Sequence, residues 1–585
     1  MGSAVGRATL FDGKVEEEAL TVKLVTVEQM RALEQATDAK GLLYAAMMEN
    51  AGQAVAIWIA QQGVAGHSVV VLTGPGNNGG DGLVAARYLE EAAADVSLYV
   101  WKRSVDNDPN WDLAQQAGVR ALWSEKDHSY AQLRQLIAGA DWVVDALLGT
   151  GVARPISGTL LQILTVVKEE VSKRRAAGEA SALQSLVPPS ATPKAGAPRV
   201  VAVDVPSGVD CDSGTVDPAT LPADTTITFA FPKMGQFLFP AAHYVGQLIV
   251  ADIGIPPQLA DDVAVEVSTP SLIRSLLPQR PLDAHKGTFG KVMVVAGSPN
   301  YTGAACLAAS AAARAGAGLV TLGVAESLHP IVASRLLEAT FLLLPHDTGV
   351  LAPTSVKPLR EKLGDYDALL LGPGLGRDEK TAAFVAQLLG PDVGAKKGHL
   401  GFVEPTKAET DAGRRLPPLV IDADGLNALA ELPGWPDVLP SLTVLTPHPG
   451  EMARLIGGTV AEVEADRLGV ARHCAAEWNA VVVLKGAYTV IAAPPAARLA
   501  EAATLAYVNP FANPALASAG SGDVLAGTIA SLLAQGLAPL DAAVAGAYLH
   551  GLAGELAREE IGTAGVVAGD LLPRLPASIR RLAQQ

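Results

Sequence analysis

The sequence predicts an α/β protein with two domains, and three observations lead to this prediction. Short runs of β-branched residues alternate with longer stretches rich in Ala and Leu, which is the pattern of parallel sheets buried between helices. These runs form two series, separated by a segment rich in Pro and charged residues. No fixed repeat relates the two series, so two different domains are favoured over a duplication. At roughly 150 residues per domain, the 585 residues allow two to four domains.

We place the domain boundary between residues 258 and 259, within Ile255–Arg280, which gives domains 1–258 and 259–585. Lys168–Arg199 and Gly394–Pro418 are interpreted as insertions, each forming a helix extension and a loop. The predicted strands of the two series are Ser68–Thr73, Val96–Trp101, Trp142–Leu147 and Val200–Val205, then Val292–Ala296, Ala368–Leu371, Leu419–Asp422, Thr443–Thr446 and Val481–Leu484.

Composition excludes several classes of protein. With 49% hydrophobic and 18% charged residues the chain is not disordered, and its net charge of −16 argues against nucleic-acid binding, which needs a basic face. Cys211, Cys306 and Cys474 are too far apart for a disulfide framework or a thiolate zinc site, and they suggest a reducing compartment. Neither a signal peptide nor a membrane-spanning run is found. We therefore expect a cytoplasmic protein without membrane or nucleic-acid partners.

A glycine-rich turn follows the first strand. The sequence GPGNNGGDG, residues 74–82, precedes a helical stretch and contains the G-x-G-x-x-G spacing of dinucleotide-binding loops. An ordinary redox site is not favoured, because Asp81 would compete with a phosphate and the amide oxygens of Asn77 and Asn78 suit a hard cation better. The alternative is that the asparagines adopt positive φ in a turn and that Asp81 caps the helix.

Two further strand ends carry a carboxylate followed by a glycine turn. These are DALLGTG and DVPSGVD, which begin at Asp145 and Asp204. The carboxyl ends of parallel strands share the edge of the sheet at which ligands bind. We therefore expect Asn78, Asp145 and the hydroxyl of Ser207 to bind a monovalent cation together with backbone carbonyls. We expect Asp204 to contact the reacting ligand. Capping explains any one of these carboxylates, but three such strand ends favour a site.

These motifs together resemble the NAD(P)H-hydrate epimerase family over residues 23–257. The resemblance implies a Rossmann-like three-layer fold and interconversion of the R and S epimers of NADHX and NADPHX, which are hydrated at C6 of the nicotinamide ring. It also implies a potassium ion held by Asn78, Asp145 and Ser207. A potassium-bound carboxylate is a poor base, so we interpret Asp204 as the catalytic proton acceptor. The residues that the resemblance places against the hydrate are Asn77, Asn78, Gly79, Gly80, Asp81, Gly149, Thr150, Gly151, Val152, Ala153, Arg154, Pro155 and Asp204.

A second glycine turn lies near the end of the chain. The sequence NPALASAGSGD, residues 513–523, leads into a helical stretch, so that its N–H groups face a transferring phosphoryl group. Asp523 then stands where an acceptor hydroxyl must lose its proton. On this motif alone, a helix N-cap is an equally good interpretation of Asp523.

Other strand ends of the second series add polar residues. VVLKG ends in Lys485 and a glycine, which suits nucleotide phosphates or adenine, and GPGLGR and DADGLN follow two further strands. In TPHPGE, His448 is held between two prolines, which favours a site residue over a core residue. No transition-metal spacing of His residues is found.

With the opening HKGTFGKVMVVAGS, these motifs are similar to those of ADP/ATP-dependent NAD(P)H-hydrate dehydratases over residues 270–580. The resemblance implies a ribokinase-like α/β fold, magnesium with ADP or ATP, and dehydration of the S epimer to NAD(P)H with release of AMP or ADP and phosphate. Together the two domains resemble bifunctional NAD(P)H-hydrate repair enzymes, which implies a homo-oligomer and favours ADP. We interpret Asp523 as the catalytic base that takes the C6 hydroxyl proton during phosphoryl transfer. The implied substrate contacts are Gly318, His448 and Asp523, and the implied nucleotide contacts are Lys485, Gly486, Ala487, Tyr488, Thr489 and Gly522.

Three other functions stay open on the sequence alone. A small-molecule kinase fused to a nucleotide-binding domain would release a stable phosphorylated product, since GSGD also fits many ribokinase-like kinases. A Rossmann oxidoreductase would oxidise or reduce its substrate without ADP or ATP. A non-catalytic interaction protein on an enzyme fold would use none of the aspartates for chemistry.

Overall fold

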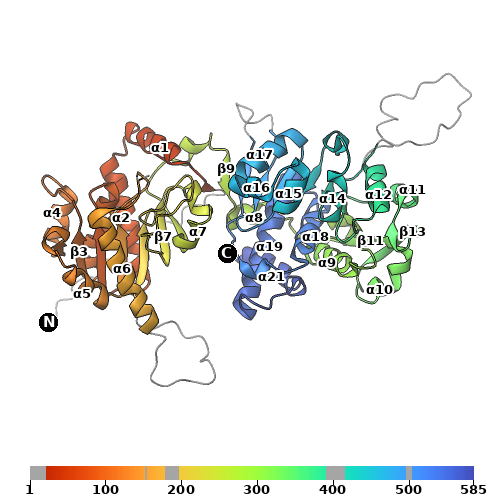
Figure 1. The fold of residues 1–585 in the computed structure, drawn as a ribbon. Helices are drawn as coiled ribbons and strands as arrows, with labels where there is room; N and C mark the ends of the chain where they lie inside the picture. The colour runs from red at the N-terminus through yellow and green to blue at the C-terminus, as the bar shows by residue number, and fades with distance from the viewer. Residues whose placement is uncertain (1–21, 152–153, 178–196, 391–415, 496–503, 585) are drawn as a thin grey trace, which may run out of the picture. The chain divides into compact units, whose positions relative to one another are not determined.

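The computed structural model describes residues 22–151, 154–177, 197–390, 416–495 and 504–584 (Figure 1). The chain divides into two compact units, one formed by Lys23–Val263 and the other mainly by Ala264–Gln585. Among the described residues, no helix is both long and apolar enough to cross a membrane.

The first unit is built on a seven-stranded sheet in which all neighbouring strands are parallel. The strand order is β4-β3-β2-β5-β6-β7-β8, so the direction of winding reverses between β2 and β5. This is the doubly wound, Rossmann-like order, in which ligands bind at the carboxyl ends of the strands beside the reversal. The strands are β2 (Ser68–Thr73), β3 (Asp95–Val100), β4 (Arg120–Trp123), β5 (Trp142–Ala146), β6 (Arg199–Val203), β7 (Thr225–Phe229) and β8 (Gln247–Ala251).

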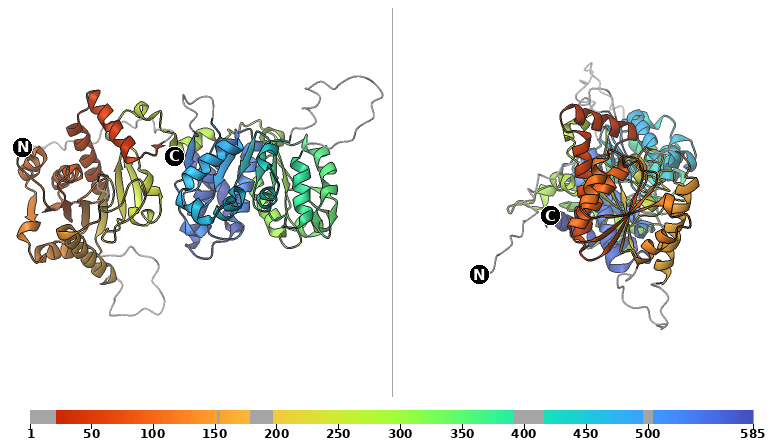
Figure 2. Two further views of the ribbon diagram at one scale, coloured as in Figure 1. Left: turned by 45° about the horizontal axis from the view of Figure 1, so that its top comes forward. Right: turned by 90° about the vertical axis from the view of Figure 1, so that its left-hand side faces the viewer.

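Helices cover both faces of this sheet, as predicted (Figures 1 and 2). Successive side chains of a strand point to opposite faces, and β2 shows the consequence. Val69 and Val71 pack in one core cluster with α2 and α3, whereas Val70 and Leu72 pack in another with α5 and α6. The helices of this unit are α1 (Val27–Ala39), α2 (Tyr44–Gln61), α3 (Asn77–Glu91), α4 (Pro109–Gln116), α5 (Ala131–Gly139), α6 (Gly158–Ala177) and α7 (Ala242–Val245).

The other large sheet has eleven strands and again reverses its winding, here between β10 and β15. The order is β1-β9-β20-β19-β18-β17-β16-β15-β10-β11-β12. Its strands are β1 (Val22–Lys23), β9 (Val265–Val267), β10 (Lys291–Val295), β11 (Leu319–Ala325), β12 (Thr340–Leu344), β15 (Ala368–Leu371), β16 (Leu419–Ile421), β17 (Thr443–Leu445), β18 (Val481–Leu484), β19 (Val490–Ala492) and β20 (Ala506–Val508); β13 (His346–Asp347) and β14 (Val350–Leu351) form a separate hairpin.

One sequence expectation fails in this sheet, because it is not wholly parallel. Strand β19 runs antiparallel to both β18 and β20. Only residues 485–489 separate β18 from β19. A parallel neighbour needs a crossover of a dozen or more residues, so this short connection can only make a hairpin.

The helix that follows the second glycine turn lies at the centre of the second unit. Helix α18 packs on α9 and lies against β10, β15 and β16, the strands around the winding reversal. It is buried along most of its length because its neighbours are sheet on one side and helix on the other. The helices of the unit are α8 (Pro270–Leu276), α9 (Thr302–Arg314), α10 (His329–Ala333), α11 (Val356–Leu363), α12 (Glu379–Leu389), α14 (Asp424–Ala430), α15 (Pro449–Ile456), α16 (Val460–Ala465), α17 (Arg467–Trp478), α18 (Ser521–Ala534), α19 (Pro539–Ile561), α20 (Ala568–Leu571) and α21 (Arg574–Gln584).

The predicted insertions are described only in part. Helix α6 runs on to Ala177, as expected of a helix extension, and the following residues 178–196 lie outside the described part of the chain. Residues 394–415 of the second insertion also lie outside it.

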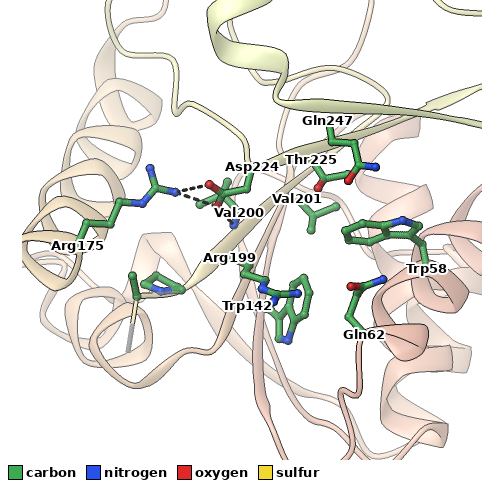
Figure 3. Close-up of a pocket in the computed structure, with 12 residues that line it drawn as sticks. Trp58, Gln62, Trp142, Arg175, Arg199, Val200, Val201, Asp224, Thr225 and Gln247 are labelled. Carbon is green, nitrogen blue, oxygen red and sulfur yellow. Dashed lines mark hydrogen bonds and ion pairs between the residues drawn. The ribbon is translucent and has the colours of Figure 1, made fainter. Parts of the chain in front are cut away.

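Each unit also has a hollow at the amino ends of its strands. Figure 3 shows the one in the first unit, where Trp142, Arg199 and Thr225 begin β5, β6 and β7. The hollow of the second unit is lined by Asp367 and Pro418, which directly precede β15 and β16. Both hollows lie at the opposite edge of the sheet from the glycine-rich turns.

Candidate active sites

The glycine turn of the first unit runs directly into helix α3, which begins at Asn77 with Gly76 as its N-cap. Asn77 and Asn78 are therefore helical, without positive φ, and Asp81 lies inside the helix. The alternative interpretation, with asparagines in a turn and Asp81 as a cap, is wrong. The turn also passes close to the next strand end: a Cβ atom on Gly74 would lie 1.8 Å from the carbonyl oxygen of Leu147.

Arg103, which the sequence analysis did not identify, holds this turn in place through hydrogen bonds. Its guanidinium donates to the carbonyl oxygens of Gly74 (3.0 Å) and Gly76 (2.9 Å), and it forms an ion pair of 2.7 Å with Asp108. The chain brings Arg103 to the turn from the loop after β3, so no local motif marks it.

The three predicted potassium ligands meet around Leu148. The Asn78 amide donates to the Leu148 carbonyl (2.9 Å), and the Leu148 N–H donates to the Ser207 hydroxyl (2.9 Å). Ser207 in turn donates to the Asp145 carboxylate from its hydroxyl (2.6 Å) and from its N–H (2.8 Å). The structure therefore brings all three residues together.

Asp145 is a buried carboxylate without a counter-charge. It is 1% exposed, and within the described part of the chain it forms no ion pair. Burial raises the pKa of Asp145, although hydrogen bonds from Ser207 and Leu147 act in the opposite direction. A buried negative charge among hydroxyl, amide and carbonyl oxygens fits a bound cation such as potassium, because hard cations prefer oxygen ligands.

Asp204 lies after β6 in a left-handed backbone conformation, with φ +63°, and is held by several donors. Its carboxylate accepts from Lys233 Nζ (2.5 Å), Thr228 Oγ1 (3.0 Å) and the Phe229 N–H (3.3 Å). The Gln236 amide donates to its backbone carbonyl (2.8 Å). The predicted proton acceptor is thus fixed in position and faces a cation.

Lys233 is a second residue that the sequence analysis missed. It is 1% exposed, and its ammonium also donates to Thr228 Oγ1 (2.9 Å) and to the Phe229 carbonyl (3.3 Å). Its sequence signal is that it is the single lysine within the apolar segment FAFPKMGQFLF. Lysine is almost never buried without a partner, so this position indicates a buried ion pair.

Asp81 differs from Asp204 in having no partner. It is 8% exposed and makes no hydrogen bond within the described residues. Burial and the charges of Asp204 and Glu34 raise its pKa well above the usual range, against the effect of Arg103 and Lys233.

The loop after β5 contributes the remaining predicted contacts of this site. Gly149 packs on Asn78, whose Cβ lies 3.2 Å from the position of a Cβ on Gly149. Thr150 is half-buried, whereas Gly151, Arg154 and Pro155 are exposed; the predicted contacts Val152 and Ala153 lie outside the described residues.

In the second unit, α18 begins at Ser521, with Gly520 as N-cap at φ +88°. Asp523 lies inside this first turn and caps nothing, so the interpretation of Asp523 as an N-cap is wrong. Its carboxyl group makes no hydrogen bond within the described residues. Burial, followed by the charge of Asp422, raises the pKa of Asp523 to about 7, although Lys485 acts in the opposite direction.

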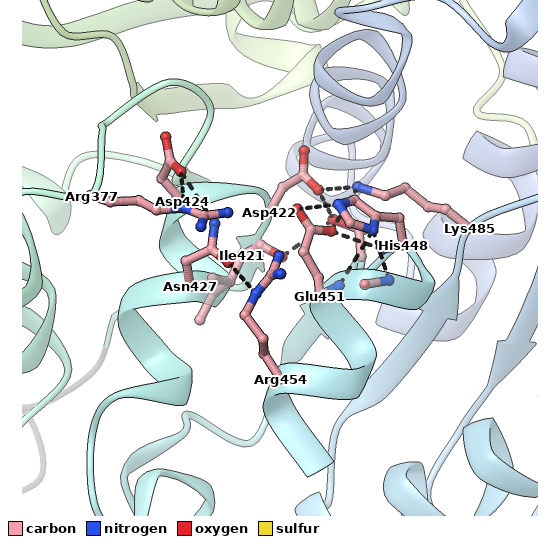
Figure 4. A network of polar contacts seen from close by, with 11 residues as sticks. Arg377, Ile421, Asp422, Asp424, Asn427, His448, Glu451, Arg454 and Lys485 are labelled. Atoms are coloured by element: carbon pink, nitrogen blue, oxygen red, sulfur yellow. Dashed lines mark hydrogen bonds and ion pairs between the residues drawn. The ribbon is translucent and has the colours of Figure 1, made fainter. Parts of the chain in front are cut away.

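Lys485 reaches the same turn from the end of β18 (Figure 4). Its ammonium lies 2.6 Å from Asp422 and 3.5 Å from Glu451, and it is 3.5 Å from the position of a Cβ on Gly522. Burial lowers the pKa of Lys485, but the two carboxylates outweigh this effect and raise it. The predicted nucleotide contacts Lys485 and Gly522 are therefore neighbours. The two carboxylate partners, Asp422 and Glu451, belong to the motifs DADGLN and TPHPGE. The sequence analysis assigned no role to either residue.

His448 is half-exposed, in agreement with the prediction that it is not a core residue. Its Nδ1 accepts from the N–H groups of Gly450 (3.0 Å) and Glu451 (3.3 Å), so it is the N-cap of α15. Burial and the charges of Lys485 and Arg454 lower its pKa, and Glu451 acts in the opposite direction. Its Nε2 lies 3.4 Å from the carboxylate of Glu451, which also lies 3.5 Å from the Lys485 ammonium.

Tight backbone contacts fix the remaining predicted residues. A Cβ on Gly318 would lie 1.7 Å from the Lys286 carbonyl, so Gly318 packs on the HKGTFG segment. The turn between β18 and β19 is closed by Thr489 Oγ1, which donates to the Gly486 carbonyl (2.8 Å). Arg467, missed by the sequence analysis, donates to the carbonyl oxygens of Leu484 and Lys485, both at 3.1 Å. Ala487 is exposed and Tyr488 is half-buried in the same turn.

A second glycine-rich turn is tied to this site through Asp424. Its carboxylate accepts from the Gly376 N–H (2.9 Å) and from the Asn427 amide (3.2 Å), and Arg377 lies 3.8 Å away (Figure 4). GPGLGR and DADGLN therefore form one surface at the winding reversal of the sheet.

In both units a glycine-rich turn leads into a helix. Buried carboxylates lie beside this turn, where the strand order of the doubly wound sheet reverses. This arrangement defines an α/β enzyme with two separate sites of the nucleotide-binding type.

Comparison with known proteins gives the family. Residues 44–235 match the family of the YjeF-related protein N-terminus, and residues 292–577 match that of NAD(P)H-hydrate dehydratase. The bifunctional NAD(P)H-hydrate repair enzyme Nnr of Moorella thermoacetica is 39% identical over 96% of this chain and 97% of its own length. The enzyme of the same name from Escherichia coli is 33% identical over 93% and 91%. The chain belongs to the family of bifunctional NAD(P)H-hydrate repair enzymes.

Solved structures are also similar to part of this chain. An ADP/ATP-dependent NAD(P)H-hydrate dehydratase from Bacillus subtilis, co-crystallised with ATP/Mg²⁺, is 30% identical and covers 54% of this chain and 98% of its own, with a TM-score of 0.41. A ribokinase-like superfamily protein from Enterococcus faecalis is 24% identical, covers 55% and 98%, and has a TM-score of 0.44.

Proposed function

We propose that the first unit interconverts the R and S epimers of NADHX and NADPHX, and that the second dehydrates the S epimer with ADP or ATP as phosphoryl donor. The observation that carries this proposal is the Asp523 carboxyl group at the first turn of α18, which has no hydrogen-bond partner among the described residues. A group with a pKa near neutrality is suited to accept a proton from the substrate hydroxyl. The helix N-terminus beside it is suited to the phosphoryl group.

In the second unit, Asp523 takes the proton of the C6 hydroxyl while the hydroxyl oxygen bonds to the terminal phosphorus of the nucleotide. The bond from that phosphorus to the bridging oxygen breaks, and AMP or ADP leaves. The N–H groups of the GSGD turn stabilise the transferring group, and Lys485 supplies a positive charge beside Gly522. The ring nitrogen lone pair then expels phosphate as the C6–O bond breaks, and loss of a C5 proton gives the C5=C6 double bond of NAD(P)H.

Magnesium fits this site as part of a metal–nucleotide complex. Within the described residues, no group of three or more His, Cys, Asp or Glu side chains is arranged to hold a metal ion by itself. Magnesium commonly keeps waters and phosphate oxygens as ligands and takes one or two protein carboxylates, for which Asp422 and Asp424 are available. When bound, it offsets the negative charge on the phosphates.

In the first unit, Asn78, Asp145 and Ser207 would hold potassium, together with the Leu148 carbonyl. A bound potassium ion neutralises Asp145 and fixes the loops after β2, β5 and β6 against one another. Asp204 would lie outside this potassium site, and its carboxylate is held instead by Lys233.

The test uses a mixed pool of R and S NADHX with potassium, magnesium and either ADP or ATP, followed by the absorbance of the reduced nicotinamide. Full recovery of NADH is the expected result, and the better nucleotide identifies the donor. Recovery of only the S fraction would contradict the epimerase assignment. Accumulation of a stable phosphorylated hydrate would instead identify a kinase.

A further inference from the structure

We propose that Asp81 is the proton donor that pairs with Asp204, and that the first unit exchanges the epimers by releasing the C6 hydroxyl as water and adding a solvent water to the opposite face of the ring. This inference rests on the epimerase function proposed above. It adds a catalytic residue and a definite route for the oxygen atom.

The first argument is the contrast between two carboxyl groups at one sheet edge. Asp204 is partly buried and accepts three hydrogen bonds, one of them from a buried ammonium group. Asp81 is more deeply buried, at 8% exposure, and makes no hydrogen bond within the described residues. A buried carboxyl group without a donor is stable in its protonated form, which can give a proton to a ligand.

The second argument is the position of the two groups on the sheet. Asp81 belongs to the helix that follows β2, and Asp204 follows β6, with β5 between these strands. Neighbouring strands are about 4.8 Å apart, so the two strand ends are separated by about 10 Å. A nicotinamide ring bound over the loop after β5, which contains Gly149, would therefore lie between the two strand ends.

The charged groups around Asp81 separate the two roles further. Asp204 and Glu34 raise the pKa of Asp81 in addition to the effect of burial, whereas Arg103 and Lys233 lower it. Within the described residues, the Lys233 ammonium forms an ion pair with Asp204 and none with Asp81. Environments that differ in this way commonly give one carboxyl group of a pair the acid role and the other the base role.

The proposed step balances. The ring nitrogen lone pair forms the C6=N bond while the C6–O bond breaks, and the departing hydroxyl takes the Asp81 proton and leaves as water. A solvent water then adds to C6 on the other face and gives a proton to Asp204. The exchange leaves Asp81 ionised and Asp204 protonated, which is the arrangement that catalyses the reverse reaction. Proton exchange with solvent restores the resting state.

The decisive experiment follows oxygen. The full-length protein converts a single epimer of NADHX in water enriched in heavy oxygen, with potassium and without nucleotide, and the product epimer is analysed by mass spectrometry. We expect one heavy oxygen atom in each molecule of product epimer, beyond the exchange in a protein-free control. A product that keeps its original oxygen would overturn the proposal, even though it would leave the epimerase function intact.

Variants then test the residue. Asp81→Asn, which has nearly the same shape, is expected to slow epimer exchange at least about a hundredfold in both directions, because general acid catalysis contributes factors of this size. ADP-driven dehydration of the S epimer by the same molecules is expected to stay unchanged, which monitors the folding of the second unit. Circular dichroism and thermal unfolding monitor the first.

The matched control is Asp95→Asn, which makes the same change at an exposed carboxylate that begins β3, at the opposite edge of the sheet. It is expected to stay within about threefold of the unmodified rate, below the range of general acid catalysis. Wild-type exchange in Asp81→Asn, or an equal loss in Asp95→Asn, would overturn the assignment of Asp81.

Discussion

Three aspartates at corresponding strand or helix ends have different chemistry because their neighbours differ. Asp145 is buried among hydrogen-bond donors, Asp204 faces a lysine, and Asp523 has no donor in the described structure. A sequence pattern cannot separate these cases, because each aspartate simply follows a strand or a glycine turn. Their neighbours suit Asp145 to binding a cation, Asp204 to accepting a proton, and Asp523 to titrating near neutral pH.

The pH dependence of dehydration tests the role of Asp523. Burial and Asp422 disfavour its charged form and raise its pKa to about 7. A base must be ionised to accept a proton, so we expect the rate of S-NADHX dehydration at saturating ADP to rise with pH through about 7 and then to level off.

The control variants separate this effect from titration of the nucleotide. Asp523→Asn is expected to abolish the pH-dependent rise along with nearly all activity. Asp347→Asn, which removes only a surface ion pair with Lys380, is expected to keep the full profile. A rise through the same pH that persists in residual Asp523→Asn activity would exclude Asp523 as the titrating group.

Lys233 is expected to contribute to both stability and activity of the first unit. Lys233→Met leaves the carboxylate of Asp204 without its cation, and breaking a buried pair in this way typically costs about 3–5 kcal/mol. We expect a lower thermal stability of the first unit and slower epimer exchange. Lys173→Met, which removes an exposed lysine that pairs with Glu170, should change the unfolding free energy by less than about 1 kcal/mol. Equal stability of the two variants would contradict the buried pair.

At the scale of elements, the second site depends on close packing of α18 on α9. A Cβ atom on Gly527 would lie 2.2 Å from the Ala308 carbonyl oxygen, which is a backbone atom and cannot rotate away. Gly527→Ala should therefore displace α18 and cost about 1–3 kcal/mol, instead of the gain that alanine normally gives in a helix. Because α18 carries the GSGD turn, we expect slower dehydration with unchanged epimer exchange.

Gly303→Ala provides the matched comparison for Gly527→Ala. Gly303 lies on α9, and a Cβ there meets open space. We expect equal or slightly higher thermal stability, within about 1 kcal/mol, and unchanged dehydration. If both variants melted at the same temperature, close packing of α18 would not be the reason for a glycine at position 527.

The elements themselves were largely predictable. Strands β2, β15 and β18 begin and end at the predicted residues, because each is a short apolar run bounded by turn residues. The antiparallel β19 was not predicted, since direction depends on the length of a connection rather than on the residues of the strand.

The residues of the candidate sites could be predicted from the sequence only where they belong to a recognisable motif. The potassium ligands lie on three motifs that share a sheet edge, and the structure brings them together as predicted. Arg103, Lys233 and Arg467 were missed, because each reaches its site from a segment without a motif and acts through contacts distant in sequence. The roles of the potassium ligands and of the catalytic aspartates stay predictions.

At the scale of the whole molecule, the two units have separate hydrophobic cores and separate sites. An epimerase on the same chain as a dehydratase lets a mixed pool of hydrates be repaired completely, because a dehydratase selective for one epimer would strand the other. This logic requires only that the epimers diffuse between sites, so each unit should work when the other is disabled.

A pair of variants tests this independence. Asp523→Ala is expected to abolish ADP-driven NADH formation while R and S NADHX still interconvert, as measured by chromatography of the two epimers. Asp145→Ala leaves Asn78 and Ser207 without the buried charge that would hold potassium, so epimer exchange should be weaker and less dependent on potassium. Dehydration of the S epimer by Asp145→Ala should equal that of the unmodified protein. A mixture of the two variant proteins should then repair both epimers fully, since each supplies the step that the other lacks. If the mixture repaired only the S epimer, the two steps would have to occur on one molecule, and independent sites would be wrong.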